Sequence, residues 1–493
     1  MSRHSPIRAA CVALPLSLLA LGIAHAQQPA PFTPPTERQG VAFTPPPVDA
    51  AMRPLAINLP TALQLAGSSP LDVAAASERL RLATAQLREA RTLWLPNVQW
   101  GVDYFRHDGR IQDVVGNVFE DHKGAFFAGM APNAVFSVSE AIFAPLAARQ
   151  VVRARQYDLQ TAANDSMLAV AEAYMNVQQA RGELSGAIEA TRRTEELAKR
   201  TEELAKDLVA PLEAIRVNAE LARRQQTEVT ARERWRLASA DLARVLRLDP
   251  AAQVEPLEPP QLRVNLLLLD KPVDEYIAIA LTYRPELAAQ QALVQAALKR
   301  LKQERLRPLT PSVLLRGAAT NPAGTLSTGT FGGGVNGTVG NFGFRNDIDI
   351  QLVWQLDHLG VGSRAKTDQR RAENQLALVE LFRVQDRVAA EANQAFAQAQ
   401  SAAQRVELAE RGLKLAVQSA DLNFEALRQT KRAGETILTV VRPSEAVAAV
   451  QALGQAYTDY YAAVADANRA QFRLYRALGQ PAQCIVPEAV PQP

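Results

Sequence analysis

Residues 194–220, TEELAKRTEELAKDLVAPLEAIRVNAE, contain a seven-residue unit that is repeated almost verbatim and is followed by a proline. Leu197 and Leu204 fall one heptad apart, the spacing that places apolar side chains along one side of a coiled-coil helix. Pro211 suits the first turn of a helix, because the N–H that it lacks would be unpaired there anyway. The segment therefore predicts two long helices joined by a corner near residues 207–213.

Long helices are also predicted from the distribution of proline. There is none between Pro145 and Pro211, nor between Pro322 and Pro443. A helix over residues 146–206 would be roughly 90 Å long at about 1.5 Å per residue. Apolar residues at near-heptad spacing predict coiled-coil packing. They form three stripes: Val170, Val177 and Leu184; Leu408, Leu415 and Leu422; and Val450, Gly454, Tyr457, Tyr461 and Val464.

The sequence contains an internal duplication. Pro70 and Pro96 have the same spacing as Pro285 and Pro311, and each pair is followed by extended segments, a long helix, a corner and a second helix. This predicts two repeats, residues 58–250 and 273–481, the second with its corner near 434–440. There Gly434 suits the left-handed residue that ends a helix. The Pro-rich segments 27–57 and 251–272, and the tail 482–493, are predicted to be linkers or tails.

Each repeat contains two extended segments, near residues 97–106 and 132–143 and near 311–320 and 346–357. Apolar and polar residues alternate along them, which predicts one apolar and one wet face. Taken alone, this alternation favours a soluble sheet with its apolar face on a protein core, because the sequence signal of each strand of a membrane barrel is weak. Predicted export and the lack of covering helices favour a lipid-facing sheet instead. The apolar set is Val98, Trp100, Val102, Tyr104, Phe136, Val138, Ile348, Ile350, Leu352, Trp354 and Leu356.

The first 26 residues have the layout of a cleaved signal peptide. Arg3 and Arg8 precede the apolar segment AACVALPLSLLALGIA, and AHA stands before Gln27. Cys484 is then the single cysteine of the mature chain, so no internal disulfide is predicted. No later apolar segment is long enough for a membrane-spanning helix, so entry into a membrane would require a β-barrel. Four strands leave open edges, which copies of the chain would have to close, with eight strands in a dimer or twelve in a trimer.

Other chemistry is not indicated. A net charge of +3 with 21% charged residues gives no nucleic-acid footprint. GGGVNG, residues 332–337, reads as a loop before a strand, so the dinucleotide-binding interpretation fails. A predicted loop of about 25 residues lacks the ligand spacing of a tight metal site; it holds His107, Asp108, Glu120, Asp121 and His122. The sequence predicts no enzyme, no cofactor and no metal.

Several segments in this order resemble the TolC-type outer-membrane efflux family over essentially the whole mature chain. They are the SP and RP sites near residues 70 and 285, LWLPNV, LVWQLDHLG, DLVAPLEAIRVNAELA and AGETILTVVRPSEAVAA. The resemblance implies a mainly α fold with a small β part, in which a homotrimer completes a 12-stranded barrel in outer-membrane lipid and an α-helical tunnel through the periplasm. It also implies docking onto a periplasmic adaptor (membrane fusion protein) and an inner-membrane pump.

The resemblance assigns two kinds of site. The helix-hairpin tips would contact the adaptor, through Leu208, Val209, Ala210, Pro211, Gly434, Glu435 and Thr436. Family members often carry Asp residues around the periplasmic aperture, just beyond the second tip, where this chain has Val440, Arg442 and Pro443. Arg442 would favour anions by the sign of its field, and Pro443 is predicted to bend its helix.

The leading functional hypothesis is a passive trimeric duct, the outer-membrane channel of a tripartite efflux or secretion system. The alternative is a soluble periplasmic coiled-coil adaptor or scaffold whose sheet packs on its own helices. Membrane fractionation separates the two, because only the first would partition with the outer membrane.

Overall fold

The computed structural model describes residues 53–68, 70–206, 208–316, 328–336, 338–433 and 436–479, all in one unit of the chain. The predicted signal peptide and the tail 482–493 lie outside the described residues. The described part is mainly helical with a small β part, as predicted.

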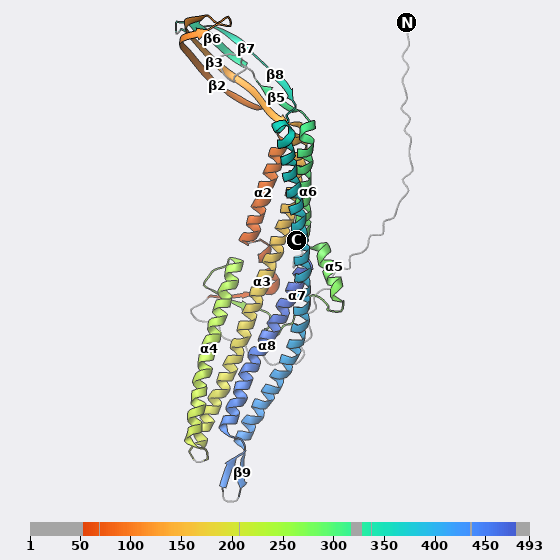
Figure 1. The fold of residues 1–493 in the computed structure, drawn as a ribbon. Coiled ribbons are helices and arrows are strands. Elements are labelled where there is room, and N and C mark those ends of the chain that lie inside the picture. The colour runs from red at the N-terminus through yellow and green to blue at the C-terminus, as the bar shows by residue number, and fades with distance from the viewer. Residues whose placement is uncertain are drawn as a thin grey trace, which may run out of the picture. The chain divides into compact units, whose positions relative to one another are not determined.

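Four long helices run side by side (Figure 1): α3 (Val138–Leu204), α4 (Pro211–Leu246), α7 (Val361–Arg428) and α8 (Pro443–Ala477). Helix α3 packs against α4 and α8, and α8 also packs against α7, so the order across the group is α4–α3–α8–α7. We call this group the four-helix wall. It confirms the two predicted helical hairpins.

Two of the three predicted apolar stripes form the contacts within the wall. Val170, Val177, Leu184, Leu197 and Leu204 of α3 are buried, and so are the apolar members of the α8 stripe. The α3–α8 contact is close because Gly182 and Gly186 of α3 lie against the rings of Tyr461 and Tyr457.

The third stripe is not covered within the single chain. Leu408, Leu415 and Leu422 of α7 are 62%, 60% and 56% exposed. Helix α7 contacts its neighbours through a different face, made mainly of alanines such as Ala392, Ala399 and Ala402. Heptad spacing identifies a side of a helix, but it does not say which partner covers that side.

Shorter helices show the duplication. Helices α1 (Leu59–Ser68) and α2 (Leu71–Arg91) precede the first strands, as α5 (Val273–Tyr283) and α6 (Pro285–Leu306) precede the later ones. Two 3-10 turns flank the strands of the second repeat: η1 (Arg307–Leu309) precedes them and η2 (Asp357–Gly360) follows them. Helices α2 and α6 both pack on α3. None of the described helices combines the length and apolar composition needed to cross a bilayer.

An antiparallel sheet is built from β2 (Asn97–Gln112), β3 (Val118–Ser137), β5 (Ser312–Arg316), β6 (Thr328–Val335), β7 (Gly340–Asn346) and β8 (Asp349–Val353). Four strands were predicted. Strands β6 and β5 pair with successive parts of β3, and β7 and β8 pair in turn with β6 and β5. The six strands therefore occupy four positions across the sheet, β2, β3, β5/β6 and β7/β8.

Two loop predictions and two strand predictions need correction. The predicted loop with His107 and His122 belongs to the long β2–β3 hairpin, and most of GGGVNG lies in β6. The strand predicted over 132–143 ends at Ser137, whose hydroxyl accepts the amide of Glu140 at 3.1 Å and caps α3. Val138 is consequently helical. Ile348, Trp354 and Leu356 flank β8 rather than lying in it.

The two predicted linkers contain a parallel strand pair, β1 (Arg53–Ile57) with β4 (Ala252–Pro256). Side chains of the wall hold it: the Tyr174 hydroxyl donates to the Ile57 carbonyl at 3.1 Å, and the Trp235 indole donates to the Val254 carbonyl at 3.1 Å. Because this pair, which we call the strand belt, is held by α3 and α4, it is part of the core.

Candidate functional site

One face of the sheet is apolar across all four strand positions. Directly paired residues of antiparallel strands point to the same side. Trp100 pairs with Met130, Tyr104 pairs with Phe126, and further along the same face Leu352 pairs with Val313. The face carries the predicted Val98, Trp100, Val102, Tyr104, Phe136, Ile350 and Leu352, together with Phe126, Met130, Phe342 and Phe344, which the sequence reasoning missed.

This apolar face is open to the surroundings of the single chain. Trp100 is 84% exposed and Phe344 is 77% exposed, and Ile348, Trp354 and Leu356 beside β8 are exposed as well. Contiguous apolar patches of this kind mark membrane or protein contact sites. No described helix of the chain packs on the sheet face.

The opposite face carries more of the polar side chains, although the exposed Phe105, Val135 and Val353 also lie on it. Gln99 and Asp103 alternate with the apolar residues of β2, and in β8 the Gln351 amide donates to the Asp349 carboxylate at 2.7 Å. A small cluster of Phe127 and Phe331 interrupts this face, with the Arg345 guanidinium 6.0 Å from the Phe331 ring centre. The sheet is thus amphipathic, with apolar and wet sides on opposite faces.

The α7 edge of the four-helix wall exposes a regular apolar row, Leu408, Leu415 and Leu422. On α4, Leu212, Ile215 and Leu237 are exposed about half a helical turn from the side that faces α3. They do not form a continuous row, because the exposed Gln226, Thr230 and Glu233 lie on the same side of α4 between Ile215 and Leu237.

Part of the first helix tip packs against the chain's own helices. The amides of Leu208 and Val209 both donate to the Leu204 carbonyl, at 2.8 and 3.0 Å, and Pro211 begins α4 as predicted. The side chains of Leu208 and Val209 are half-buried against a cluster that includes residues of α7 and α8. Ala210 and Pro211 are exposed.

The second tip differs from its prediction. Helix α7 ends at Arg428, and a hairpin of β9 (Thr430–Ala433) and β10 (Thr436–Thr439) follows, so Gly434 does not end the helix. Gly434 and Glu435 lie outside the described residues. Thr436 is the first residue of β10.

At the base of this hairpin Val440 is 36% exposed, and its amide donates to the Gln429 carbonyl at 3.2 Å. The exposed Arg442 caps α8 with an extended backbone. Pro443 is the first residue of α8 and does not bend it, because a first-turn proline removes no helical hydrogen bond.

No protein-family model and no curated protein matches the sequence. Solved structures do match. The OprN outer-membrane channel is similar at 17% sequence identity, with 91% of this chain and 98% of that chain covered and a TM-score of 0.69. The Campylobacter jejuni CmeC outer membrane channel is similar at 15% identity, with 86% of this chain and 85% of that chain covered and a TM-score of 0.67. The open-state Neisseria gonorrhoeae MtrE outer membrane channel is similar at 16% identity, 91% and 98% coverage and TM-score 0.64. The chain has the fold of these outer-membrane channels. The resemblance to the TolC-type family is confirmed at the level of the fold.

An ion network around the buried Arg284 ties the helices of this channel fold together. Arg284, 3% exposed, contacts Glu286 at 2.9 Å and Glu391 at 2.5 Å. Arg476 of α8 contacts the same two carboxylates and Asp165 of α3, at 2.6–3.2 Å. Burial raises the pKa of Asp165, an effect that Arg284 opposes and Glu391 reinforces. Sequence reasoning missed this network, because charges on helices are usually solvated.

The predicted loop histidines lie on the β2–β3 hairpin. His122 Nδ1 is 3.1 Å from an Asp108 carboxylate oxygen, and Arg106 contacts the same carboxylate at 2.6 Å. Over the residues that the structure describes, no group of three His, Cys, Asp or Glu side chains could hold a metal ion.

Proposed function

We propose that the chain is the outer-membrane channel of a tripartite efflux or secretion system, a passive homotrimeric duct that reaches from the outer membrane into the periplasm. The observation that carries this proposal is the sheet, whose exposed apolar face and polar opposite face occur in the fold of outer-membrane channels. The chain would perform no chemistry, so the driving force would come from its partners.

The sheet would lie in the lipid with the Trp100 face outward. Removing an exposed side chain of this size from water stabilises the inserted state by about 2–3 kcal/mol. Strands β2 and β7/β8 are edges in the single chain. Unpaired edge amides in hydrocarbon cost several kcal/mol each, so sister copies must close the ring. With four strand positions in each chain, three copies give a 12-stranded barrel.

The long helices of neighbouring copies would also pack against one another to close a ring. The α7 row of Leu408, Leu415 and Leu422 would pack on the outer side of α4 of the next copy, where Leu212, Ile215 and Leu237 are exposed, and would join three walls into a helical tunnel. Such a head-to-tail contact forms a ring when its rotation closes.

The tips would meet the partners. Leu208, Val209, Ala210 and Pro211 on the first tip, and Gly434, Glu435 and Thr436 on the second, would contact a periplasmic adaptor that also binds an inner-membrane pump. Ala210 and Pro211 are the exposed members of the first tip, while Leu208 and Val209 also support it from within.

Arg442, with Val440 and Pro443 beside it, would line the periplasmic aperture and favour anions there by the sign of its charge. Arg442→Ala is expected to change the ion selectivity or leak of the channel in planar bilayers. Currents identical to those of the wild type would remove Arg442 from the aperture.

Fractionation of cells that express the full chain tests the main proposal. We expect the protein in the outer-membrane fraction, as an oligomer that resists mild detergent and dissociates on heating. Leu415→Asp should weaken the oligomer, whereas Leu257→Asp, a matched change at an exposed leucine that lies on neither outer edge of the wall, should leave it intact. A stable, detergent-independent monomer in the soluble periplasmic fraction would instead establish the adaptor or scaffold alternative.

A further inference from the structure

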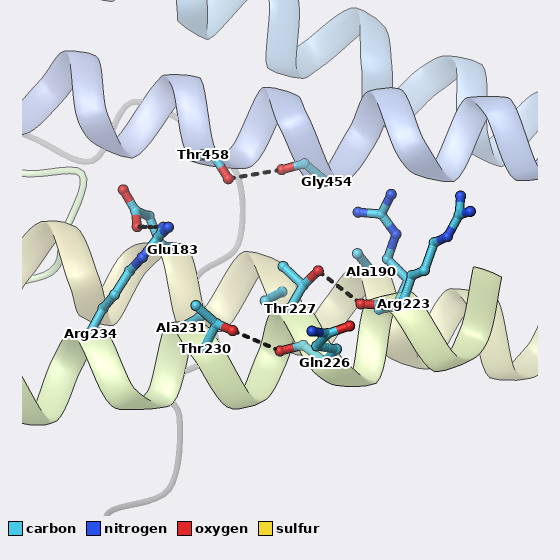
Figure 2. A pocket seen from close by; sticks show the side chains of 12 residues that line it. Glu183, Ala190, Arg223, Gln226, Thr227, Thr230, Ala231, Arg234, Gly454 and Thr458 are labelled. Carbon is cyan, nitrogen blue, oxygen red and sulfur yellow. Dashed lines mark hydrogen bonds and ion pairs between the residues drawn. The ribbon is translucent and has the colours of Figure 1, made fainter. Parts of the chain in front are cut away.

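A cleft of about 410 Å³ lies on the four-helix wall, where α4 and α8 flank α3 (Figure 2). Ala187 and Ala190 of α3 form a floor of small side chains, and Gly454 and Thr458 of α8 line one side. The α4 side carries arginines, including Arg223 and Arg234, which Figure 2 shows near the two ends of the labelled α4 segment.

The contacts of α3 identify which face of the wall carries this cleft. Arg181 of α3 donates to the Pro256 carbonyl of the strand belt at 2.5 Å. At about 100° per residue, Glu183 and Ala190, which line the cleft, lie roughly 180–200° from Arg181 around the helix. Gly182 and Gly186 on one flank contact α8. The cleft is therefore on the face of the wall opposite to the strand belt.

The cleft contains more positively charged than negatively charged side chains. Arg234 is 3.4 Å from Glu183, and Arg223 is 3.9 Å from Glu220; these arginine side chains are 61% and 76% exposed, while both carboxylates are buried. Arg224 pairs closely with the same Glu220, at 2.7 Å. Three guanidinium groups thus share two carboxylates, which leaves excess positive charge on the exposed side.

The donors available to a ligand are the guanidinium N–H groups and the side-chain amide of Gln226. The hydroxyls of Thr227, Thr230 and Thr458 donate to backbone carbonyls of their own helices, at 2.9, 3.1 and 3.2 Å (Figure 2). Guanidinium groups bind carboxylates and phosphates well, since their planar N–H pairs match two oxygen atoms. The volume of the cleft lies in the range of small-molecule sites.

We propose that the wall face opposite to the strand belt lines the duct, and that the arginine-lined cleft is a transient binding site for organic anions in transit. This inference rests on the proposed function, because it needs a conducting channel. Arg223 and Arg234 are separated by roughly 16 Å along α4 at about 1.5 Å per residue. A small anion would contact one of them, whereas an elongated molecule with two acidic groups would contact both.

Planar-bilayer recordings on the purified full chain test the inference. Under a KCl gradient, the wild type is expected to prefer chloride. Arg223→Gln/Arg234→Gln should lower the chloride-to-potassium permeability ratio by about fivefold, because a charge about 8 Å from the ion path in water changes the two permeabilities by about twofold each and in opposite directions. Citrate, a small organic anion, should reduce the wild-type current more than that of this variant. Arg223→Lys/Arg234→Lys keeps the charges and should keep the chloride preference.

Arg232→Gln is the matched control, because Arg232 is on the other side of α4 and pairs with Glu228 at 2.9 Å. It should leave both readouts unchanged. Normal currents with unchanged selectivity and citrate block in the double glutamine variant would overturn this inference and leave the proposed function standing. A wild-type protein that forms no conducting pore would overturn both.

Discussion

The contact between α3 and α8 offers two glycine substitutions with the same chemistry and opposite expected results. A Cβ on Gly186 of α3 would lie 2.5 Å from the Cβ of Tyr457. A Cβ on Gly412 of α7 would meet nothing within 4 Å. Both glycines are inside long helices, so only the surroundings of the new methyl group differ.

The magnitudes follow from two effects. Replacing a mid-helix glycine by alanine stabilises a helix by about 1 kcal/mol, and this gain applies at both positions. At Gly186 the new methyl group overpacks the contact, which typically costs about 1–3 kcal/mol. Because the opposing atom is at the root of the Tyr457 side chain, the ring cannot rotate away. Gly186→Ala should therefore be neutral to about 2 kcal/mol destabilising, and Gly412→Ala should stabilise by about 1 kcal/mol.

Urea unfolding measures the difference on the Leu415→Asp background, in one detergent and at one protein concentration, because Gly412 lies beside Leu408 and Leu415 on the side of α7 that is proposed to contact another copy. The midpoint should rise for Gly412→Ala and stay level or fall for Gly186→Ala. Adding Gly182→Ala, whose Cβ would lie 2.5 Å from the Tyr461 ring, should lower it further. Equal increases for Gly186→Ala and Gly412→Ala would refute the close α3–α8 contact.

Three further changes test how the linkers are held. Hydrogen bonding from Lys414, assisted by Arg263, keeps the pKa of Glu410 below its ordinary 4.5 despite some burial. Glu410→Gln should therefore cost about 0.5–1 kcal/mol in urea unfolding at pH 7, and this cost should disappear as the pH falls through the lowered pKa and the native carboxylate loses its charge. Asn468 bonds an amide and a carbonyl of the 251–272 segment, both at 2.8 Å; Asn468→Leu should cost about 2–4 kcal/mol, and an unchanged urea midpoint would argue against these bonds. Trp235→Ala, at a fully buried indole bonded to the strand belt, should cost about 3–5 kcal/mol and increase proteolytic cleavage within residues 251–272.

The long helices and the duplication could be predicted from the sequence because their determinants are local. Heptad spacing at Leu197 and Leu204, and a proline at position 211, act within a few residues along the chain. The structure buries both leucines and starts α4 at the proline. The amphipathic strands were also predictable, since period-two alternation is local as well.

Features that depend on distant partners were missed. Residues 53–57 and 252–256 look like linkers until each is seen as the other's partner. Gly332 reads as loop because glycine is a weak strand former. In the sheet it is needed, because a Cβ there would lie 2.4 Å from the Phe342 ring. Likewise, Arg284 and Glu391 are far apart in sequence, and nothing local indicates that they meet.

The exposed stripe of α7 leads to a physical argument about assembly. A helix that served only its own chain would direct its large aliphatic residues inward, where each buried leucine contributes about 1.5–3 kcal/mol. Among the described residues of α7, alanines predominate on the covered side, while Leu408, Leu415 and Leu422 are exposed at strict heptad spacing. Exposed leucines scattered singly need no explanation, but a regular row on a helix has the geometry of a coiled-coil seam. The row therefore predicts a second helix from outside the chain, and under the proposed function this helix would be α4 of another copy.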